Sequence, residues 1–188
     1  MYGDRMAARR LEPEDWIAAG LDALERGGVE AIAIVPLARE LGVTRGSFYW
    51  HFDSRDELLT GVLGRWEHEH SELTLQAVSA IADPRERLRA ILERAVLKPP
   101  SYFARLLDAA DREPLVAATL ERSAKARLAT LAAAYRGCGM RPADARRRAL
   151  LAYAAYVGLA RMPQSGSGSL SPRERRALAA EVVATFVP

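Results

Sequence analysis

The chain has 188 residues, of which 49% are hydrophobic and 27% are charged, and this ordinary globular composition argues against a disordered protein. Its one cysteine, Cys138, excludes an intramolecular disulfide and argues against a cysteine-based zinc site. The formal net charge is +3, but the heavy use of arginine can follow from a GC-rich genome and does not by itself indicate nucleic-acid binding.

The N-terminal stretch MYGDRMAARRLEPEDW carries scattered charges and no apolar run, so we expect no secretory signal. No segment approaches the roughly 18 to 20 consecutive apolar residues that a membrane-spanning helix needs. We therefore expect a soluble, cytoplasmic protein that has no membrane partner.

Helical periodicity runs through nearly the whole chain, whereas strand patterns and hairpin turns are almost absent. Prolines and glycines divide the sequence into helices, and the prediction is an all-α fold. Nine helices are expected, at 13–27, 34–41, 44–51, 54–80, 83–97, 101–111, 114–136, 142–161 and 172–186. The stretch PQSGSGSLS at 163–171 is expected to be a flexible loop.

The segment GVTRGSFYWHF at 42–52 gathers three consecutive aromatic side chains, an arginine and a histidine in a chain that is only 7% aromatic. Together with the preceding residues ARELG it forms two short helical patterns joined by a tight turn that contains glycine. This is the form of a helix-turn-helix motif. The second helix is expected to be about 12 Å long, which suits the width of the DNA major groove.

Phe48 and Phe52 are four residues apart and share one helix face, which we expect to pack inward on Leu37, Leu41 and the first helix. Trp50 then faces outward, where it can pack on a sugar or on a thymine methyl group. The alternative is that all three aromatic residues simply seal the junction between small helices.

The remaining outward side chains suit DNA. Arg45 can read guanine through two parallel hydrogen bonds, and Ser47 is a short, adaptable donor and acceptor. Gly46 allows a close approach of the backbone. Tyr49 and His51 can donate to phosphate oxygens, which fixes the register of a protein on the duplex without reading its sequence.

The block from Trp16 to Trp66 resembles the N-terminal domain of the tetracycline-repressor-like (TetR) family of transcriptional regulators. The resemblance is carried by GG at 27–28, LARELGVTRGSFYWHF at 37–52 and SRDELL at 54–59. It implies a helix-turn-helix DNA-binding domain at 1–53 and a helical effector-binding and dimerisation domain at 54–188.

The resemblance also implies roles for single residues. Base contacts are expected from Arg45, Gly46 and Ser47. Phosphate contacts are expected from Thr44, Tyr49, His51 and Arg55, the last standing where the family usually has lysine. The family often has threonine and a basic residue at the start of the second helix, but this chain has the apolar stretch AIAIVP at 31–36 there.

The charge of the N-terminal part is unusual for a DNA-binding domain. Residues 1–53 contain six arginines and nine acidic residues, a net charge of −3. The local placement of arginines must therefore supply the positive field. Arg9 and Arg10 form either an arm that reaches DNA or a frayed, solvated end.

One short recognition helix reads few base pairs, so we expect a homodimer bound to an inverted-repeat operator in double-stranded DNA. By the resemblance, the last two helices form the dimer interface, although their apolar faces could instead seal only the chain's own core. The expected interface residues are Leu150, Leu151, Ala154, Val157, Leu178, Val182 and Phe186.

The family holds its effector between the middle helices, and an apolar cavity with a few polar groups would suit an apolar or aromatic small molecule. Each candidate residue could also be ordinary core. The expected pocket residues are Leu88, Leu92, Tyr102, Phe103, Leu107, Leu128 and Tyr135. The usual switch would lower the affinity for DNA when the effector binds. The sequence does not separate repression from activation, and a repressor is expected because repression is the commoner outcome in the family.

Two rival functions stay open at this point. His68 and Glu72 lie four residues apart on a helix and could ligate a metal, which would fit a metal-dependent enzyme. No phosphate-binding loop, nucleophile elbow or Cys–His pair is evident, so we expect no enzyme and no cofactor. The other rival is a helical protein-interaction module that does not bind DNA.

Overall fold

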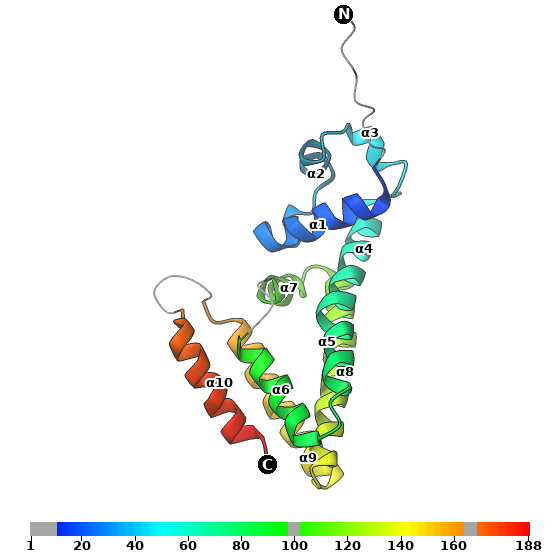
Figure 1. Ribbon diagram of the computed structural model, residues 1–188. Helices are drawn as coiled ribbons and strands as arrows, with labels where there is room; N and C mark the ends of the chain where they lie inside the picture. The colour runs from blue at the N-terminus through cyan, green and yellow to red at the C-terminus, as the bar shows by residue number, and fades with distance from the viewer. Residues whose placement is uncertain (1–10, 98–101, 164–168) are drawn as a thin grey trace, which may run out of the picture. The chain divides into compact units, whose positions relative to one another are not determined.

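The computed structural model describes residues 11–97, 102–163 and 169–188, in which every regular element is helical (Figure 1). The expected all-α fold is confirmed. The elements are α1 (Pro13–Gly27), a 3₁₀ turn η1 (Val29–Ala31), α2 (Ile34–Glu40), α3 (Arg45–Phe48), α4 (Arg55–Glu67), a π-helical turn η2 (His68–Glu72), α5 (Leu73–Ser79), α6 (Pro84–Leu97), α7 (Phe103–Ala109), α8 (Pro114–Gly137), α9 (Pro142–Ala160) and α10 (Pro172–Phe186).

The chain divides into two compact units, of which the first ends at Arg65 and the second begins at Trp66. The functional boundary expected between 53 and 54 stays a prediction. Arg9 and Arg10, and the centre of the expected loop at 163–171, lie outside the described residues.

The first unit is built on α1. Pro13 takes the first helical position, where the N–H that proline lacks would have no partner in the helix. The Glu12 N–H donates to Asp15 Oδ2 at 2.8 Å, which satisfies another backbone group at this end. Trp16 and Leu24 are fully buried, so α1 supplies the centre of the unit's core.

The helix-turn-helix consists of α2 and α3 with a tight turn between them. Gly42 has a φ of +70°, a conformation that side-chain-bearing residues rarely adopt, and the Val43 N–H donates to Ala38 O at 2.9 Å. Phe48 is 0% exposed and Phe52 is 6% exposed, which confirms that these two rings face inward.

The helix expected at 44–51 is shorter in the structure. α3 ends at Phe48, and a tighter turn continues the path, in which the His51 N–H donates to Phe48 O at 2.9 Å. The turn brings Phe52 onto the same core as Phe48, with 5.4 Å between their ring centroids. Phe48 also meets Trp16 edge-on at 5.3 Å, so α3 is anchored on α1.

The single helix expected at 54–80 is three elements, which is why the described residues contain ten α-helices rather than nine. α4 gives way to the π-helical turn η2, in which the Leu73 N–H donates to His68 O, five residues back. An inserted turn of this kind shifts the helix face by one residue and leaves no periodic signal in the sequence.

The second unit packs α8 mainly against α9, and α6 against α10 and α8 (Figure 1). Its main core contains Leu88, Leu131, Ala149 and Val183 from these four helices. The N–H of Glu174 donates to the Ser171 hydroxyl at 3.2 Å, so α10 begins with a side-chain cap. None of the helices described is long and apolar enough to span a membrane.

Candidate functional site

The outer surface of α3 and its following turn carries the residues expected to contact DNA. Trp50 is 83% exposed and Tyr49 is 47% exposed. Thr44, Arg45 and Gly46 are also exposed, whereas Ser47 and His51 are half-buried. The structure therefore brings seven of the eight expected residues together on one short, solvent-facing segment; the eighth, Arg55, begins α4.

Arg45 and Tyr49 are linked side chain to side chain. Arg45 Nη2 donates to the Tyr49 hydroxyl at 2.8 Å, and the guanidinium carbon lies 5.6 Å from the centre of the Tyr49 ring. One turn of helix separates the two residues, so the contact holds the long arginine side chain along the exposed face. This restraint reduces the conformational entropy that Arg45 loses when it binds a partner.

Gly46 has no structural reason to be glycine. Its φ lies outside the positive region, and an added Cβ would meet nothing closer than the Thr44 hydroxyl oxygen at 3.6 Å. That distance is an ordinary van der Waals contact. The missing side chain therefore leaves open space at the start of α3 on the solvent side.

Arg55 is engaged with the backbone of its own unit. Nε donates to Ile32 O at 2.9 Å and Nη2 donates to Val29 O at 3.0 Å, while Nη1 lies 3.7 Å from Asp56 Oδ1. These bonds tie the start of α4 to the segment around η1. The phosphate contact expected of Arg55 stays a prediction, and the geometry gives this residue a task in holding the fold.

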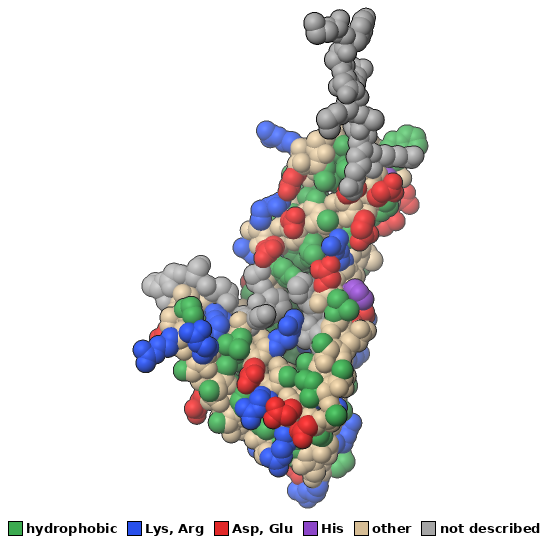
Figure 2. All heavy atoms as spheres, viewed as in Figure 1, with side chains coloured by type: hydrophobic (Ala, Val, Ile, Leu, Met, Phe, Trp, Pro, Cys, Tyr) green, Lys and Arg blue, Asp and Glu red, His purple; other side chains and the backbone are tan. Residues whose placement is uncertain are grey.

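Positive charge near the motif is local. The Arg26 guanidinium donates to Glu40 at 2.7 Å and is thereby neutralised, whereas Arg39 and Arg45 are exposed. Figure 2 shows acidic and basic side chains interspersed over the visible face. A partner that carries negative charge would thus be attracted at particular arginines and not by a broad basic surface.

Comparison with known proteins identifies the motif. The family model "Bacterial regulatory proteins, tetR family" matches residues 17–62, which cover most of α1 through the first half of α4. Residues 17–62 are therefore similar to the TetR family of bacterial regulators. The HTH-type transcriptional regulator SrpR of Pseudomonas putida is 40% identical over 52 residues, 28% of this chain and 24% of that protein. The chain matches less than half the length of its curated relatives.

Solved structures extend the likeness to the whole fold. A transcriptional regulator from Rhodococcus sp. Rha1 has a TM-score of 0.77 and 24% identity, over 94% of this chain and 96% of that one. A regulator from Saccharomonospora viridis in complex with choline has a TM-score of 0.79 and 20% identity, over 92% and 95%. At these identities the likeness concerns the fold alone.

The residues expected to line a TetR-type effector pocket separate into two groups. Four lie in or against the main core of the second unit: Leu88, Leu92, Leu128 and Tyr135. Phe103 lies apart from them, between the rings of Trp66 and Tyr156. Tyr102, which precedes Phe103 in the sequence, is also buried, and Leu107 is half-buried.

Burial raises the pKa of Tyr135 to about 12, although the positive charge of Arg148 acts to lower it.

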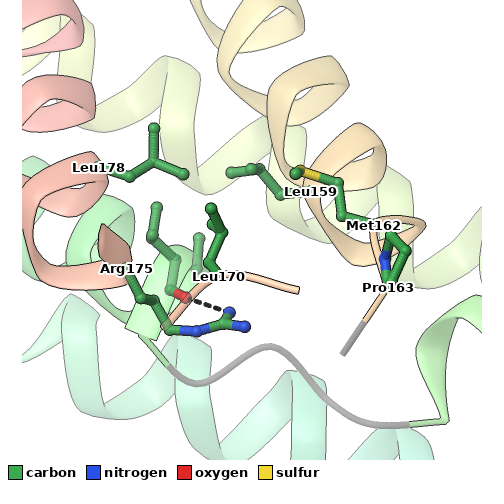
Figure 3. A pocket seen from close by; sticks show the side chains of 8 residues that line it. Leu159, Met162, Pro163, Leu170, Arg175 and Leu178 are labelled. Atoms are coloured by element: carbon green, nitrogen blue, oxygen red, sulfur yellow. Dashed lines mark hydrogen bonds between the residues drawn. The ribbon is translucent and has the colours of Figure 1, made fainter. Parts of the chain in front are cut away.

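Two hollows lie in the described part of the second unit. One, between the end of α9 and the start of α10, encloses about 10 Å³, barely one water, and Arg175 closes it by donating to Val96 O at 3.1 Å (Figure 3). The other is an open groove of about 490 Å³ between the η2–α5 segment and α6. Leu73, Val78 and Leu97 line it, together with Glu69, Glu93 and Arg94.

The expected dimer residues lie on the surface of α9 and at the edge of the core in α10. Leu150 is 57% exposed, Leu151 is 60% exposed, and Ala154 is exposed. The other four expected interface residues are half-buried: Val157, Leu178, Val182 and Phe186. Two of these, Val182 and Phe186, also pack against the chain's own core. α9 thus presents an apolar stripe that the core does not use.

The rival metal site, at His68 and Glu72, has two candidate ligands that contact each other. His68 Nδ1 and Glu72 Oε2 lie 2.9 Å apart, so the two side chains hold each other. The described residues contain no group of three or more side chains that could bind a metal.

Sequence reasoning missed Arg127 and Tyr156. The Arg127 guanidinium lies 5.1 Å from the Tyr156 ring centre and 5.5 Å from that of Phe103. An arginine on an alanine-rich helix reads as a solvated residue, so periodicity alone could not show this placement. Tyr153 and Tyr156, three apart in α9, were the available sign of an aromatic cluster.

Proposed function

We propose that the chain is a ligand-responsive transcriptional regulator that binds an inverted-repeat operator as a homodimer and represses transcription until a small molecule releases it. The observation that carries the proposal is the division of one aromatic run. Phe48 and Phe52 are buried, whereas Tyr49 and Trp50 between them are exposed. A run that only sealed a junction between helices would not leave Trp50 in solvent.

The surface beside these aromatic residues has the chemistry that DNA requires. Arg45 offers a fork of donors to a guanine edge, and Thr44, Tyr49 and His51 offer donors to phosphates. The match to the family of bacterial regulatory proteins and the likeness to an HTH-type transcriptional regulator support this proposal. The alternative, a protein-interaction module, would use the exposed Trp50 and Tyr49 as apolar contacts.

Selection of sites from a random duplex DNA library tests the proposal. We expect enrichment of an inverted repeat whose half-sites lie about one helical turn apart, bound with an affinity that falls steeply as salt rises. Recovery of no sequence above bulk DNA, from well-folded protein, would reject operator binding. The protein-interaction alternative would then be the better account.

Arg45→Ala separates base reading from simple charge attraction. We expect a loss of about 1–3 kcal/mol in binding the selected site and a relaxed preference at one position of each half-site. Arg136→Ala, which removes an exposed arginine from α8, is the matched control and should leave the preference unchanged. An equal loss on all sequences would instead make Arg45 a phosphate contact.

A further inference from the structure

Tyr49 is held in place although almost half of its surface is exposed. Its ring packs edge-to-face with the ring of Phe48, with 5.2 Å between the centroids and an interplanar angle of 86°. Phe48 in turn meets Trp16 of α1 at 5.3 Å, and both of these side chains are 0% exposed. The core of the first unit therefore restrains the orientation of the Tyr49 ring.

The conformation of Arg45 depends on this restrained ring. Arg45 Nη2 donates to the Tyr49 hydroxyl at 2.8 Å, and the guanidinium carbon lies 5.6 Å from the centre of the Tyr49 ring. An exposed arginine otherwise samples many rotamers, because its side chain is long and flexible. A fixed acceptor one helical turn away favours the rotamers that reach it.

The hydrogen bond leaves both side chains able to bind DNA at the same time. A guanidinium carries several N–H donors in a fixed fork, so one bond from Nη2 leaves an edge of the fork with a pair of parallel donors for guanine. The Tyr49 hydroxyl accepts from Arg45 and keeps its own hydrogen to donate to a phosphate oxygen. The hydroxyl can thus join a group that binds the DNA backbone to a group that reads a base.

We propose that Tyr49 is a positioning residue for Arg45: its hydroxyl binds an operator phosphate and holds the guanidinium in register with a guanine edge. The inference rests on the proposed function, because it assigns how the same surface discriminates between sequences. A hydroxyl that donates to an anionic oxygen becomes a stronger acceptor, so the two hydrogen bonds strengthen each other. A phosphate contact, which by itself carries no sequence information, then contributes to base selection.

Tyr49→Phe removes the hydroxyl and keeps the ring that packs on Phe48. Its binding is measured on the selected operator and on operators with every other base at the guanine where Arg45→Ala loses its preference. We expect the preference for guanine to fall about three- to tenfold, with the thermal stability of the free protein unchanged. Loss of affinity by one factor on every operator would make Tyr49 a phosphate contact alone and would overturn the proposal, as would unchanged binding.

Thr44→Val is the matched control, because it removes a hydroxyl from an exposed residue that is also expected to contact phosphate and that makes no side-chain cap at the start of α3. We expect it to weaken binding to every operator by a similar factor and to keep the preference for guanine. An equal relaxation of the preference in Thr44→Val and Tyr49→Phe would overturn a specific role for Tyr49.

The double variant Arg45→Ala with Tyr49→Phe tests whether the tyrosine acts through the arginine. Once Arg45 is absent, Tyr49→Phe should change the base preference at that position no further. Effects of the two substitutions on the preference that simply add would show that Tyr49 acts independently, and would overturn the proposal.

Operators that carry a single neutral methylphosphonate test the phosphate step. At one position in each half-site, this replacement should lower both the affinity of the wild type and its preference for guanine. The same replacement should leave the remaining preference of Tyr49→Phe unchanged. A scan that finds no position where the preference falls would overturn the coupling between phosphate and base.

The outcome is separable from that of the proposed function. Recovery of no enriched sequence by the wild-type protein rejects the regulator and, with it, the present inference. An enriched inverted repeat whose guanine preference survives Tyr49→Phe rejects only the positioning role of Tyr49.

Discussion

Gly46 and Arg55 show that neighbouring residues of one motif can serve opposite purposes. The chain's own packing gives no reason for glycine at position 46. Arg55, in contrast, donates to two carbonyls of the first unit. We therefore propose that Gly46 serves the contact with DNA and that Arg55 chiefly stabilises the fold. Mutation can separate these roles.

Gly46→Ala should stabilise the free protein slightly, by roughly 0.5–1 kcal/mol, because alanine loses less backbone entropy than glycine in a helix. The same methyl group should weaken operator binding, because it occupies space that a DNA backbone or base edge would approach. Thermal denaturation and operator titration of one preparation measure both effects. Unchanged operator affinity would contradict a close approach at this residue.

Arg55→Lys should destabilise the protein, because one ammonium group cannot reach both carbonyls in the geometry of a guanidinium fork. We expect a loss of about 1–3 kcal/mol in unfolding free energy, as two buried carbonyls lose a charged donor. Arg26→Lys, which alters an exposed ion pair, is the control and should cost little. Chemical denaturation compares the two. Equal small effects would contradict a structural role for Arg55 and favour the phosphate contact expected from the family.

At the scale of elements, α9 exposes apolar side chains that lie outside the described core of its own chain. Leu150 and Leu151 expose more than half of their surface, although α9 packs along α8. Two neighbouring exposed leucines beside Ala154 form an apolar stripe of the kind that a second copy of a helix can cover. This exposure supports the proposed homodimer, and we propose that α9 contributes to its interface.

Leu150→Glu combined with Leu151→Glu should convert the dimer to monomers, since burying two carboxylates against a partner helix costs several kcal/mol. Leu73→Glu, at an exposed leucine of α5, is the matched control and should remain dimeric. Sedimentation equilibrium measures the state of each protein. A monomeric wild type, or a dimer that survives both charges, would move the interface away from this part of α9.

At the scale of the whole molecule, DNA binding and effector binding are proposed for different compact units of one chain. The units meet in sequence within α4, between Arg65 and Trp66. Any coupling between the two ligands must then be reciprocal, because both equilibria share one set of states.

A small-molecule effector should lower the affinity for the selected operator by some factor, and the operator should lower the affinity for the effector by the same factor. Titrations of effector with and without saturating operator, and of operator with and without saturating effector, measure both factors. Unequal factors would show that the effector acts on DNA or on unfolded protein and not through a linked equilibrium.

The sequence determined the fold class, most helix boundaries and the inward and outward sides of the recognition helix. These follow from local rules: prolines and glycines end helices, and residues four apart share a face. Phe48 and Phe52 could be placed inward, and Trp50 outward, from spacing alone. The TetR-family resemblance of residues 16–66 rests on the same local motifs.

Only the tertiary structure decided what depends on contacts between distant segments. The π-helical turn at His68–Glu72 interrupts the helix expected at 54–80, and nothing in the residue types of this segment predicts the interruption. Arg55 finds its carbonyls more than twenty residues away, and Arg127 meets Phe103 and Tyr156 from other helices. Periodicity shows which face of a helix is apolar, but packing among all the helices decides what that face contacts. The stacking of Phe103 on Trp66 and Tyr156 could therefore not be predicted from the sequence.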